Sequence, residues 1–216
     1  GLEHTVLTKR PGGGIIALGK ELLKRDWKLW RFARKFRPDV LVARVGPSAA
    51  HVGFLIGRPV IVFEDTEDAT LQQKLAFPFA TRVCTAKHYE KDWGAKHIRY
   101  QSFDELAYLH PNRFTPNPEV ARGCGLEPGQ YIIVRFVSWQ AAHDIGESGI
   151  DAAHRLKTLE ALEKHGRVLV TSEAPLPDEY ERFRLPLPPE QFHHLLAFAR
   201  LTYGESSTVA TEGAML

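Results

Sequence analysis

Residues 37–69 read RPDVLVARVGPSAAHVGFLIGRPVIVFEDTEDA and hold, in order, an apolar strand, a helix of small residues and a second apolar strand. The first strand is expected over 40–43. A Gly-Pro pair then starts a helix over 48–56, and a Gly-Arg-Pro sequence separates that helix from a strand over 60–63. This order is typical of a βαβ unit, whose two strands lie parallel in one sheet.

The same alternation continues on both sides of this unit. Upstream, apolar residues at helical spacing predict a helix over 15–36, which Pro38 ends. Downstream, the first half is expected to hold a helix over 66–77, a strand over 82–85, a helix over 88–93 and a strand over 97–100. The second half is expected to hold strands over 131–137 and 167–171, helices over 149–165 and 189–200, and a strand that ends at Tyr203. The fold class is therefore α/β with parallel sheets.

Proline and glycine concentrate between residues 111 and 129. Because such residues break helices and strands, we place a domain junction within this segment. We predict an N-terminal domain over 1–115 and a C-terminal domain over 116–216. The chain begins with Gly1 and its last helical pattern stops without a terminating residue, so we expect both domains to be incomplete at their outer ends.

Composition narrows the classes of function. A formal charge of +2 is too small to indicate a nucleic-acid-binding domain. Cys84 and Cys124 fit neither a disulfide framework nor a zinc motif, which favours a reducing cytoplasm and no metal. No apolar run reaches the roughly 18 residues that span a bilayer, so we expect a protein that is soluble or peripheral to a membrane.

A polar turn follows the last strand of the second half and leads into a helix. It comprises Gly204, Glu205, Ser206, Ser207 and Thr208. Backbone N–H groups at a helix start, together with hydroxyl groups, favour a phosphate. Glu212 comes one turn later, where its carboxylate can accept two hydroxyl hydrogen bonds, as a ribose diol requires. An ordinary Ser/Thr cap with a solvent-facing glutamate explains the pattern equally well.

The run GESSTVATEGAML, residues 204–216, is similar to the Gly/Ser-rich turn and glutamate-bearing helix of MurG-like GT-B glycosyltransferases. This resemblance implies a diphosphate on the turn and a ribose on Glu212. Residues 37–69 resemble the N-terminal domain of the GT-B fold, in a segment shared with UDP-N-acetylglucosamine 2-epimerases. Through EDTEDA, DELAYLHPNRF, RFVSWQAAHDIGESGI, VLVTSE and GESST, nearly the whole chain resembles an uncharacterised archaeal and bacterial family of predicted glycosyltransferases. These resemblances imply two Rossmann-like domains of the GT-B type.

Four carboxylates follow the strand over 60–63, at the rim where parallel sheets bind ligands: Glu64, Asp65, Glu67 and Asp68. Like charges this close raise one another's pKa, which suits a general base that takes a proton from a sugar hydroxyl. We therefore treat Glu64, Asp65 and Glu67 as candidate catalytic residues. A solvated acidic loop that caps the next helix is the alternative.

A second candidate loop follows the strand over 131–137 and carries Ser138, Trp139, His143 and Asp144. His143 is the fourth candidate catalytic residue, either as a cation beside a diphosphate or as a proton donor to a leaving group. Ser138, Trp139 and Asp144 are assigned to the nucleotide-sugar site. In the resembling epimerases the loop after this strand carries a histidine that contacts the nucleotide, whereas a plain His143–Asp144 pair is the alternative.

Three further positions are weaker candidates. Ser172 and Glu173 close the strand over 167–171, where a helix cap explains them equally well. Arg135 lies within a strand, and a structural salt bridge is favoured over a phosphate contact.

The helix over 15–36 combines many Lys and Arg residues with Trp27, Trp30, Phe32 and Phe36. Basic amphipathic helices can lie on anionic membranes. Such a helix more often packs its apolar stripe on a sheet and shows its charges to water. Because MurG-like enzymes use lipid-linked acceptors, a peripheral membrane contact stays open.

Together these patterns favour a glycosyltransferase that binds a nucleotide-sugar donor, needs no metal cofactor and transfers the sugar to an unidentified acceptor. A UDP-sugar 2-epimerase is the second interpretation, since it would use the same fold without an acceptor. A nucleotide-sugar-binding protein without turnover is the third. The sugar, the base and the acceptor stay open, because a fold carries function only by analogy.

Overall fold

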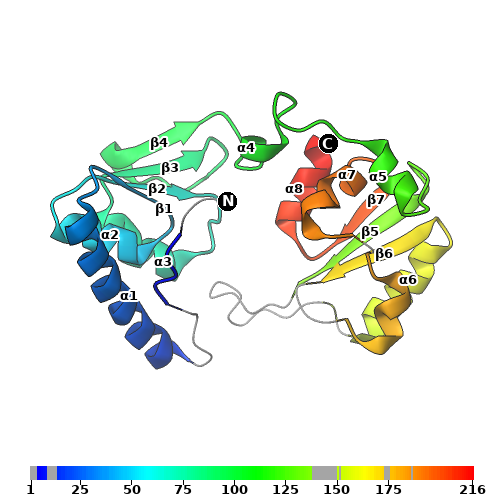
Figure 1. Cartoon of the computed structure of the whole chain (residues 1–216), viewed down its shortest axis with the longest axis horizontal. Coiled ribbons are helices and arrows are strands. Elements are labelled where there is room, and N and C mark those ends of the chain that lie inside the picture. Colours follow the sequence, from blue (N-terminus) through cyan, green and yellow to red (C-terminus); the bar gives the residue numbers. More distant parts are fainter. Residues whose placement is uncertain (1–3, 9–13, 138–149, 151, 173–175, 186) are drawn as a thin grey trace. The chain divides into compact units, whose positions relative to one another are not determined.

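A computed structural model describes residues 4–8, 14–137, 150, 152–172, 176–185 and 187–216 (Figure 1). The chain divides into two compact units, Gly1–Asp104 (unit 1) and Glu105–Leu216 (unit 2). The division precedes helix α4 (Leu106–Leu109), whereas the sequence placed the junction after residue 115. Residues just before 115 belong with unit 2 because they contact its interior. The Tyr108 hydroxyl donates to Glu212 at 2.7 Å, and the Phe114 ring lies 4.8 Å from the His194 ring.

Unit 1 is built on a parallel sheet with the order β1-β2-β3-β4. Its strands are β1 (Leu41–Arg44), β2 (Val60–Glu64), β3 (Arg82–Ala86) and β4 (His97–Tyr100). Helices α1 (Ile15–Phe36), α2 (Pro47–Leu55) and α3 (Thr70–Ala76) lie on one side of it (Figure 1). Short 3-10 turns, η1 (Phe77–Phe79) and η2 (Gly94–Lys96), complete the unit.

The core of unit 1 lies between these helices and one face of the sheet. It includes Ala33 of α1, Val52 of α2, Val62 of β2 and Phe77, all buried. Gly53 permits the close approach of α2 to the sheet, because a Cβ there would lie 2.1 Å from a Val60 methyl group. Small residues in the helix over 47–55 thus set the spacing of this βαβ unit.

Unit 2 has a parallel sheet with the order β6-β5-β7. Its strands are β5 (Tyr131–Phe136), β6 (Arg167–Ser172) and β7 (Leu201–Gly204), and its further helices are α5 (Pro118–Gly123), α6 (Ala152–Glu163), α7 (Phe192–Leu196) and α8 (Ser207–Met215). Two 3-10 turns, η3 (Asp178–Phe183) and η4 (Pro189–Gln191), lie between β6 and α7. The central strand β5 is buried on both faces. Ile133 packs with Leu195 and Val209, whereas Val134 packs with Leu159 and Phe183.

The structure confirms the predicted fold class, an α/β protein with two Rossmann-like parallel sheets. The predicted helix over 88–93 is wrong, because this segment is bound through tertiary contacts instead. The Glu90 N–H donates to the Glu67 carboxylate at 3.1 Å, and the Trp93 ring meets Phe77 edge to face at 4.6 Å. The helix expected over 189–200 is shorter than predicted and spans only η4 and α7.

Candidate functional site

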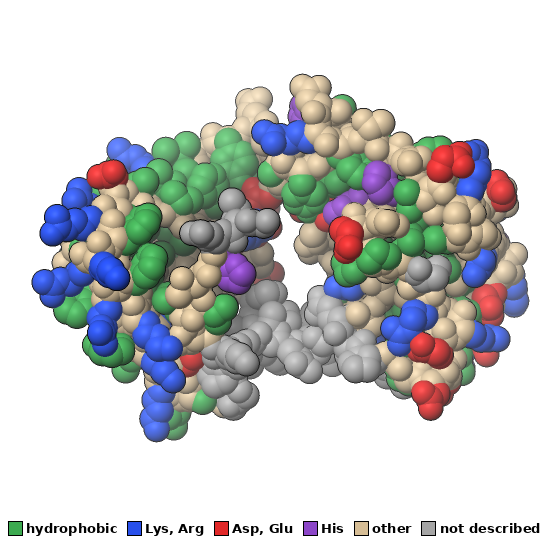
Figure 2. All heavy atoms as spheres, in the orientation of Figure 1, with side chains coloured by type: hydrophobic (Ala, Val, Ile, Leu, Met, Phe, Trp, Pro, Cys, Tyr) green, Lys and Arg blue, Asp and Glu red, His purple; other side chains and the backbone are tan. Residues whose placement is uncertain are grey.

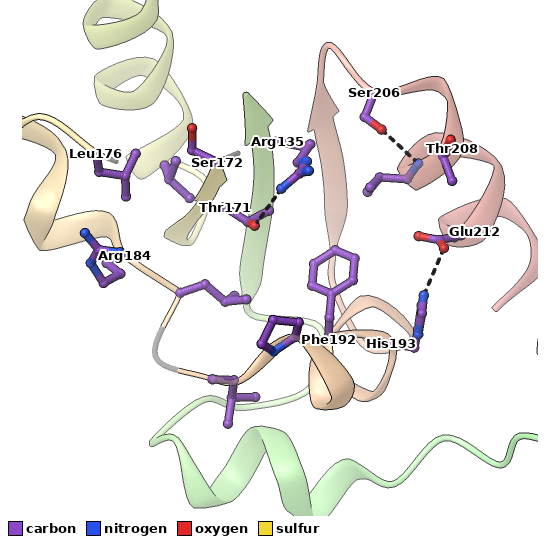
Figure 3. A pocket seen from close by; sticks show the side chains of 15 residues that line it. Arg135, Thr171, Ser172, Leu176, Arg184, Phe192, His193, Ser206, Thr208 and Glu212 are labelled. Atoms are coloured by element: carbon purple, nitrogen blue, oxygen red, sulfur yellow. Dashed lines mark hydrogen bonds and ion pairs between the residues drawn. The ribbon is translucent and has the colours of Figure 1, made fainter. Parts of the chain in front are cut away.

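A cavity of about 690 Å³ lies in unit 2, at the carboxyl edge of its sheet (Figure 3). Ligand pockets commonly have roughly 300 to 1,000 Å³, so the volume fits a small-molecule ligand. Its polar lining comes from β5, the end of β6, the segment between β6 and α7, α7 itself, and α8 with its cap: Arg135, Thr171, Ser172, Arg184, His193, Ser206, Thr208 and Glu212. An apolar wall of Val170, Leu176, Leu185, Leu187 and Phe192 completes it.

The turn after β7 brings the start of α8 to this cavity. Gly204 has φ 147°, and a Cβ there would lie 2.1 Å from the Arg135 carbonyl oxygen, so the turn requires glycine. Ser206 caps α8 by accepting a hydrogen bond from the Val209 N–H at 3.3 Å. The hydroxyls of Ser206 and Thr208 thus line the cavity beside the positive end of a helix.

Glu212 lies on the cavity wall one turn into α8 and is only 6% exposed. Its Oε1 accepts hydrogen bonds from the Tyr108 hydroxyl at 2.7 Å and from His193 Nε2 at 3.0 Å. Burial raises the pKa of Glu212, but the bonds from His193 and Tyr108 outweigh burial and hold the pKa below its usual range. The carboxylate is therefore ionised at neutral pH. It accepts hydrogen bonds from two side chains of unit 2, of which Figure 3 shows His193.

Two guanidinium groups contribute positive charge to the lining. Arg135 donates from Nη1 to the Thr171 hydroxyl at 3.1 Å, and Figure 3 shows its side chain between β6 and the start of α8. Arg184 is held by both carboxylate oxygens of Glu181, at 2.6 and 2.7 Å. Cations, hydroxyls and a helix start around one cavity are the groups that bind phosphate in proteins.

Comparison with solved structures finds matches over most of this chain. UDP-GlcNAc 2-epimerase from Methanocaldococcus jannaschii matches over 94% of this chain, with a TM-score of 0.59 and 14% sequence identity. The chain has a GT-B-like fold. It spans 66% of the length of that epimerase. MurG from Acinetobacter baumannii matches over 98% of this chain and 72% of its own, with a TM-score of 0.33 and 11% identity.

No protein-family model matches the chain. No curated protein matches it either. The likeness to the epimerase structure therefore shows the GT-B-like fold, and function must be argued from the site.

The predicted nucleotide-sugar residues of the 204–212 segment divide into two groups in this GT-B-like fold. Ser206, Thr208 and Glu212 line the cavity, and Ser207 is exposed at the start of α8. Glu205 instead binds protein groups. Its side chain is 5% exposed and accepts from the Val137 N–H at 3.0 Å, the Ile150 N–H at 2.5 Å and the Arg155 guanidinium at 3.4 Å.

Four predicted site residues, Ser138, Trp139, His143 and Asp144, lie outside the described residues, as does Glu173. Their roles stay predictions. Glu205 binds the residues that flank 138–149, because it accepts hydrogen bonds from the N–H groups of Val137 and Ile150.

The three candidate carboxylates of unit 1 each bind protein groups, and Glu64 binds the loop that carries it. Glu64 is 2% exposed and its Oε1 accepts from the N–H groups of Asp65 and Thr66, each at 2.9 Å. Burial raises the pKa of Glu64, and the charge of Asp65 adds to the rise. The two hydrogen bonds lower the pKa but do not outweigh burial. Asp65 forms an ion pair with Arg44, and Glu67 accepts from the Glu90 N–H at 3.1 Å.

Sequence reasoning missed several groups of the cavity. Arg135, interpreted as structural, lines it, and so do Thr171 and Arg184. His193 and Tyr108 hold Glu212 from segments far away in the chain, so no local spacing could have linked them. The consecutive His193 and His194 within the predicted helix over 189–200 were the one available signal.

Within the described residues no group of three or more His, Cys, Asp or Glu side chains is placed to hold a metal ion. The cavity's own groups are cations, hydroxyls and one carboxylate network. Its chemistry is therefore that of anion and hydroxyl recognition.

Proposed function

We propose that the cavity of unit 2 binds the diphosphate and ribose of a nucleotide sugar, and that the protein is a glycosyltransferase. The observation that carries this proposal is the capped start of α8, which opens on the cavity beside Arg135 and Glu212. The diphosphate would bind the N–H groups of α8, the Ser206 and Thr208 hydroxyls and the Arg135 guanidinium.

The ionised Glu212 suits the ribose. A carboxylate has about four acceptor positions, and the bonds from Tyr108 and His193 leave capacity for ribose hydroxyls. Because Tyr108 and His193 both belong to unit 2 and bind Glu212 without a ligand, the carboxylate is oriented before a ligand binds. Such preorganisation lowers the entropy that binding costs.

The catalytic roles of Glu64, Asp65, Glu67 and His143 stay predictions, as do Ser138, Trp139 and Asp144 in the donor site. Among the unit 1 carboxylates, the Asp65 side chain is 29% exposed, whereas Glu64 is enclosed by its own loop. Asp65 is therefore the more accessible of these two carboxylates, and it is paired with Arg44. We propose no metal cofactor, a cytoplasmic location, and an unidentified acceptor, for which a lipid-linked molecule is one candidate.

The test is a calorimetric titration of UDP, GDP and CMP, and of their sugar conjugates, into the chain. We expect one nucleotide to bind and Glu212→Gln to weaken it about tenfold, because the neutral amide is a weaker acceptor for ribose hydroxyls. Glu160→Gln, at an exposed position of α6, is the matched control and should bind normally. A folded protein that binds none of these ligands contradicts the proposal.

A UDP-sugar 2-epimerase is the second candidate, supported by the likeness to the Methanocaldococcus jannaschii epimerase. Product analysis separates the two reactions. Conversion of the donor into its 2-epimer without any acceptor favours the epimerase, and a new glycoside formed only with an acceptor favours the transferase. Tight binding with neither product would instead indicate a non-catalytic nucleotide-sugar-binding protein.

A further inference from the structure

We propose that helix α1 is a docking surface for an anionic lipid membrane. The surface, here the α1 stripe, consists of Ile16, Lys20, Leu23, Trp27, Arg31 and Arg34. Membrane docking by α1 does not depend on nucleotide binding in unit 2, so either property can be absent without the other.

The stripe faces solvent along the length of α1. Its members follow one another at intervals of three or four residues, which places them along one side of a helix. All six are exposed, and the apolar members are strongly so: Ile16 is 77%, Leu23 71% and Trp27 53% exposed. Large apolar side chains repeated along one solvent-facing line indicate a surface that is covered by a partner.

The inward side of α1 is a different set of residues. Ala33 is buried in the core of unit 1, and Leu29 and Trp30 pack against that core. The helix therefore already has its ordinary apolar contact with the protein. The stripe is a second apolar line, and packing within unit 1 does not explain it.

Positive charge predominates on α1. Residues 15–36 hold seven Lys or Arg residues and two acidic ones. Glu21 is bound by Arg25 and Thr8, and Asp26 by His51 at 2.8 Å. Among the residues that the structure describes, no ion pair includes Lys20, Arg31 or Arg34, so the stripe presents positive charge to its surroundings.

Aromatic and basic groups alternate within the same surface. Within the α1 stripe, the Arg31 guanidinium lies 4.8 Å from the Trp27 ring centre. Arg34 contacts a ring of the inward side, since its guanidinium lies 4.9 Å from the Trp30 ring centre. Figure 2 shows Lys and Arg side chains along α1 with hydrophobic side chains among them. Indole rings favour the membrane interface, while guanidinium groups bind lipid phosphates.

This combination favours a lipid surface over nucleic acid. Phosphate backbones are bound by cations and hydrogen-bond donors, and they give no burial to Ile16 or Leu23. An anionic membrane satisfies both kinds of side chain at once, with the helix lying in the interface plane. Within the described residues no helix is long and apolar enough to cross a bilayer, so the contact would be peripheral.

The test is flotation of the full chain with vesicles of equal parts phosphatidylglycerol and phosphatidylcholine, and with phosphatidylcholine alone. We expect flotation with the anionic vesicles only, and its loss in high salt. The double variant Arg31→Gln, Arg34→Gln should bind roughly 25-fold more weakly, at about fivefold for each charge. Leu23→Ala with Trp27→Ala should weaken binding about tenfold, because apolar burial is lost.

The matched control is Lys157→Gln with Lys164→Gln, which removes two exposed charges from unit 2. It should float like the unchanged protein, and circular dichroism should show that all variants are folded. No flotation with anionic vesicles, equal flotation with neutral vesicles, or equal losses in the control and the α1 variants would each overturn the proposal. If no flotation is found, two further results would identify a different partner and overturn the proposal. One is binding of a mixed-sequence RNA, and the other is self-association that is lost in the double variant Leu23→Ala with Trp27→Ala.

Discussion

Gly204 controls how closely α8 approaches the sheet of unit 2. A Cβ at this position would lie 2.1 Å from the Arg135 carbonyl oxygen, and that oxygen also accepts the Glu205 N–H at 3.0 Å. The backbone of β5 cannot yield without breaking this bond. One residue type thus fixes the position of the cavity's helix relative to its central strand.

We therefore predict that Gly204→Ala lowers the free energy of unfolding by about 3 kcal/mol or more, from steric overlap and an unfavourable φ. Urea denaturation measures this loss. Gly123→Ala is the control, since it lies in α5 with open space around its Cβ, and it should be neutral or stabilising by up to about 1 kcal/mol. Equal stability of the two variants would show that the turn tolerates a side chain.

Glu212 makes the stability of unit 2 depend on pH. Its pKa is lowered in the folded state, so its ionised form contributes stability above the unfolded pKa of about 4.3, and that contribution is lost as pH falls through the folded pKa. We expect Glu212→Gln to cost about 1 to 2 kcal/mol near neutral pH and much less at a pH of about 3. Urea unfolding at both pH values checks this. A cost that stays constant between them would mean that the Glu212 charge contributes nothing.

At the scale of elements, α8 depends on its cap. Ser206 accepts the Val209 N–H at 3.3 Å, whereas the neighbouring Ser207 is exposed as the first residue of the helix. Ser206→Ala should cost about 1 kcal/mol of unfolding free energy in thermal denaturation. Ser207→Ala serves as the comparison and should change little. If the two serines prove equivalent, the cap assignment is incorrect.

The elements also show what periodicity can predict. The helix over 15–36 and the strand over 97–100 were predicted with the bounds that the structure has. Both have strong local signals, a long apolar period in one and a short run between breakers in the other. The segment over 88–93 failed because the Glu67 carboxylate and the Phe77 ring bind it from distant positions. Short segments give too few helical bonds to resist such contacts.

The candidate site divides in the same way. Ser206, Thr208 and Glu212 could be placed together because strand, turn and helix are consecutive in sequence, whereas Glu205 binds protein groups instead of lining the cavity. Tyr108 and His193 were not predicted, because the two residues reach Glu212 across long stretches of chain. Arg135 was interpreted as structural because strand alternation alone does not say which face of a sheet carries a ligand.

At the scale of the whole molecule, the two units carry different features. Unit 2 has a sheet covered on both faces and a polar cavity at its carboxyl edge, whereas unit 1 contributes a carboxylate-rich loop and the exposed stripe of α1. The GT-B-like fold accounts for the two parallel sheets. The proposed glycosyltransferase function depends above all on whether the cavity of unit 2 binds a diphosphate.

The most direct measurement is the affinity for the nucleoside diphosphate that the calorimetric screen selects. This affinity is compared between the variants Thr208→Val and Thr211→Val. Both changes replace a hydroxyl by a methyl group on α8, but only Thr208 lines the cavity. We expect an affinity about tenfold lower for Thr208→Val, from the loss of one hydrogen bond to a charged phosphate, and no change for Thr211→Val. Equal affinities in the two variants, with binding intact, would mean that the nucleotide binds elsewhere and that the proposed site is wrong.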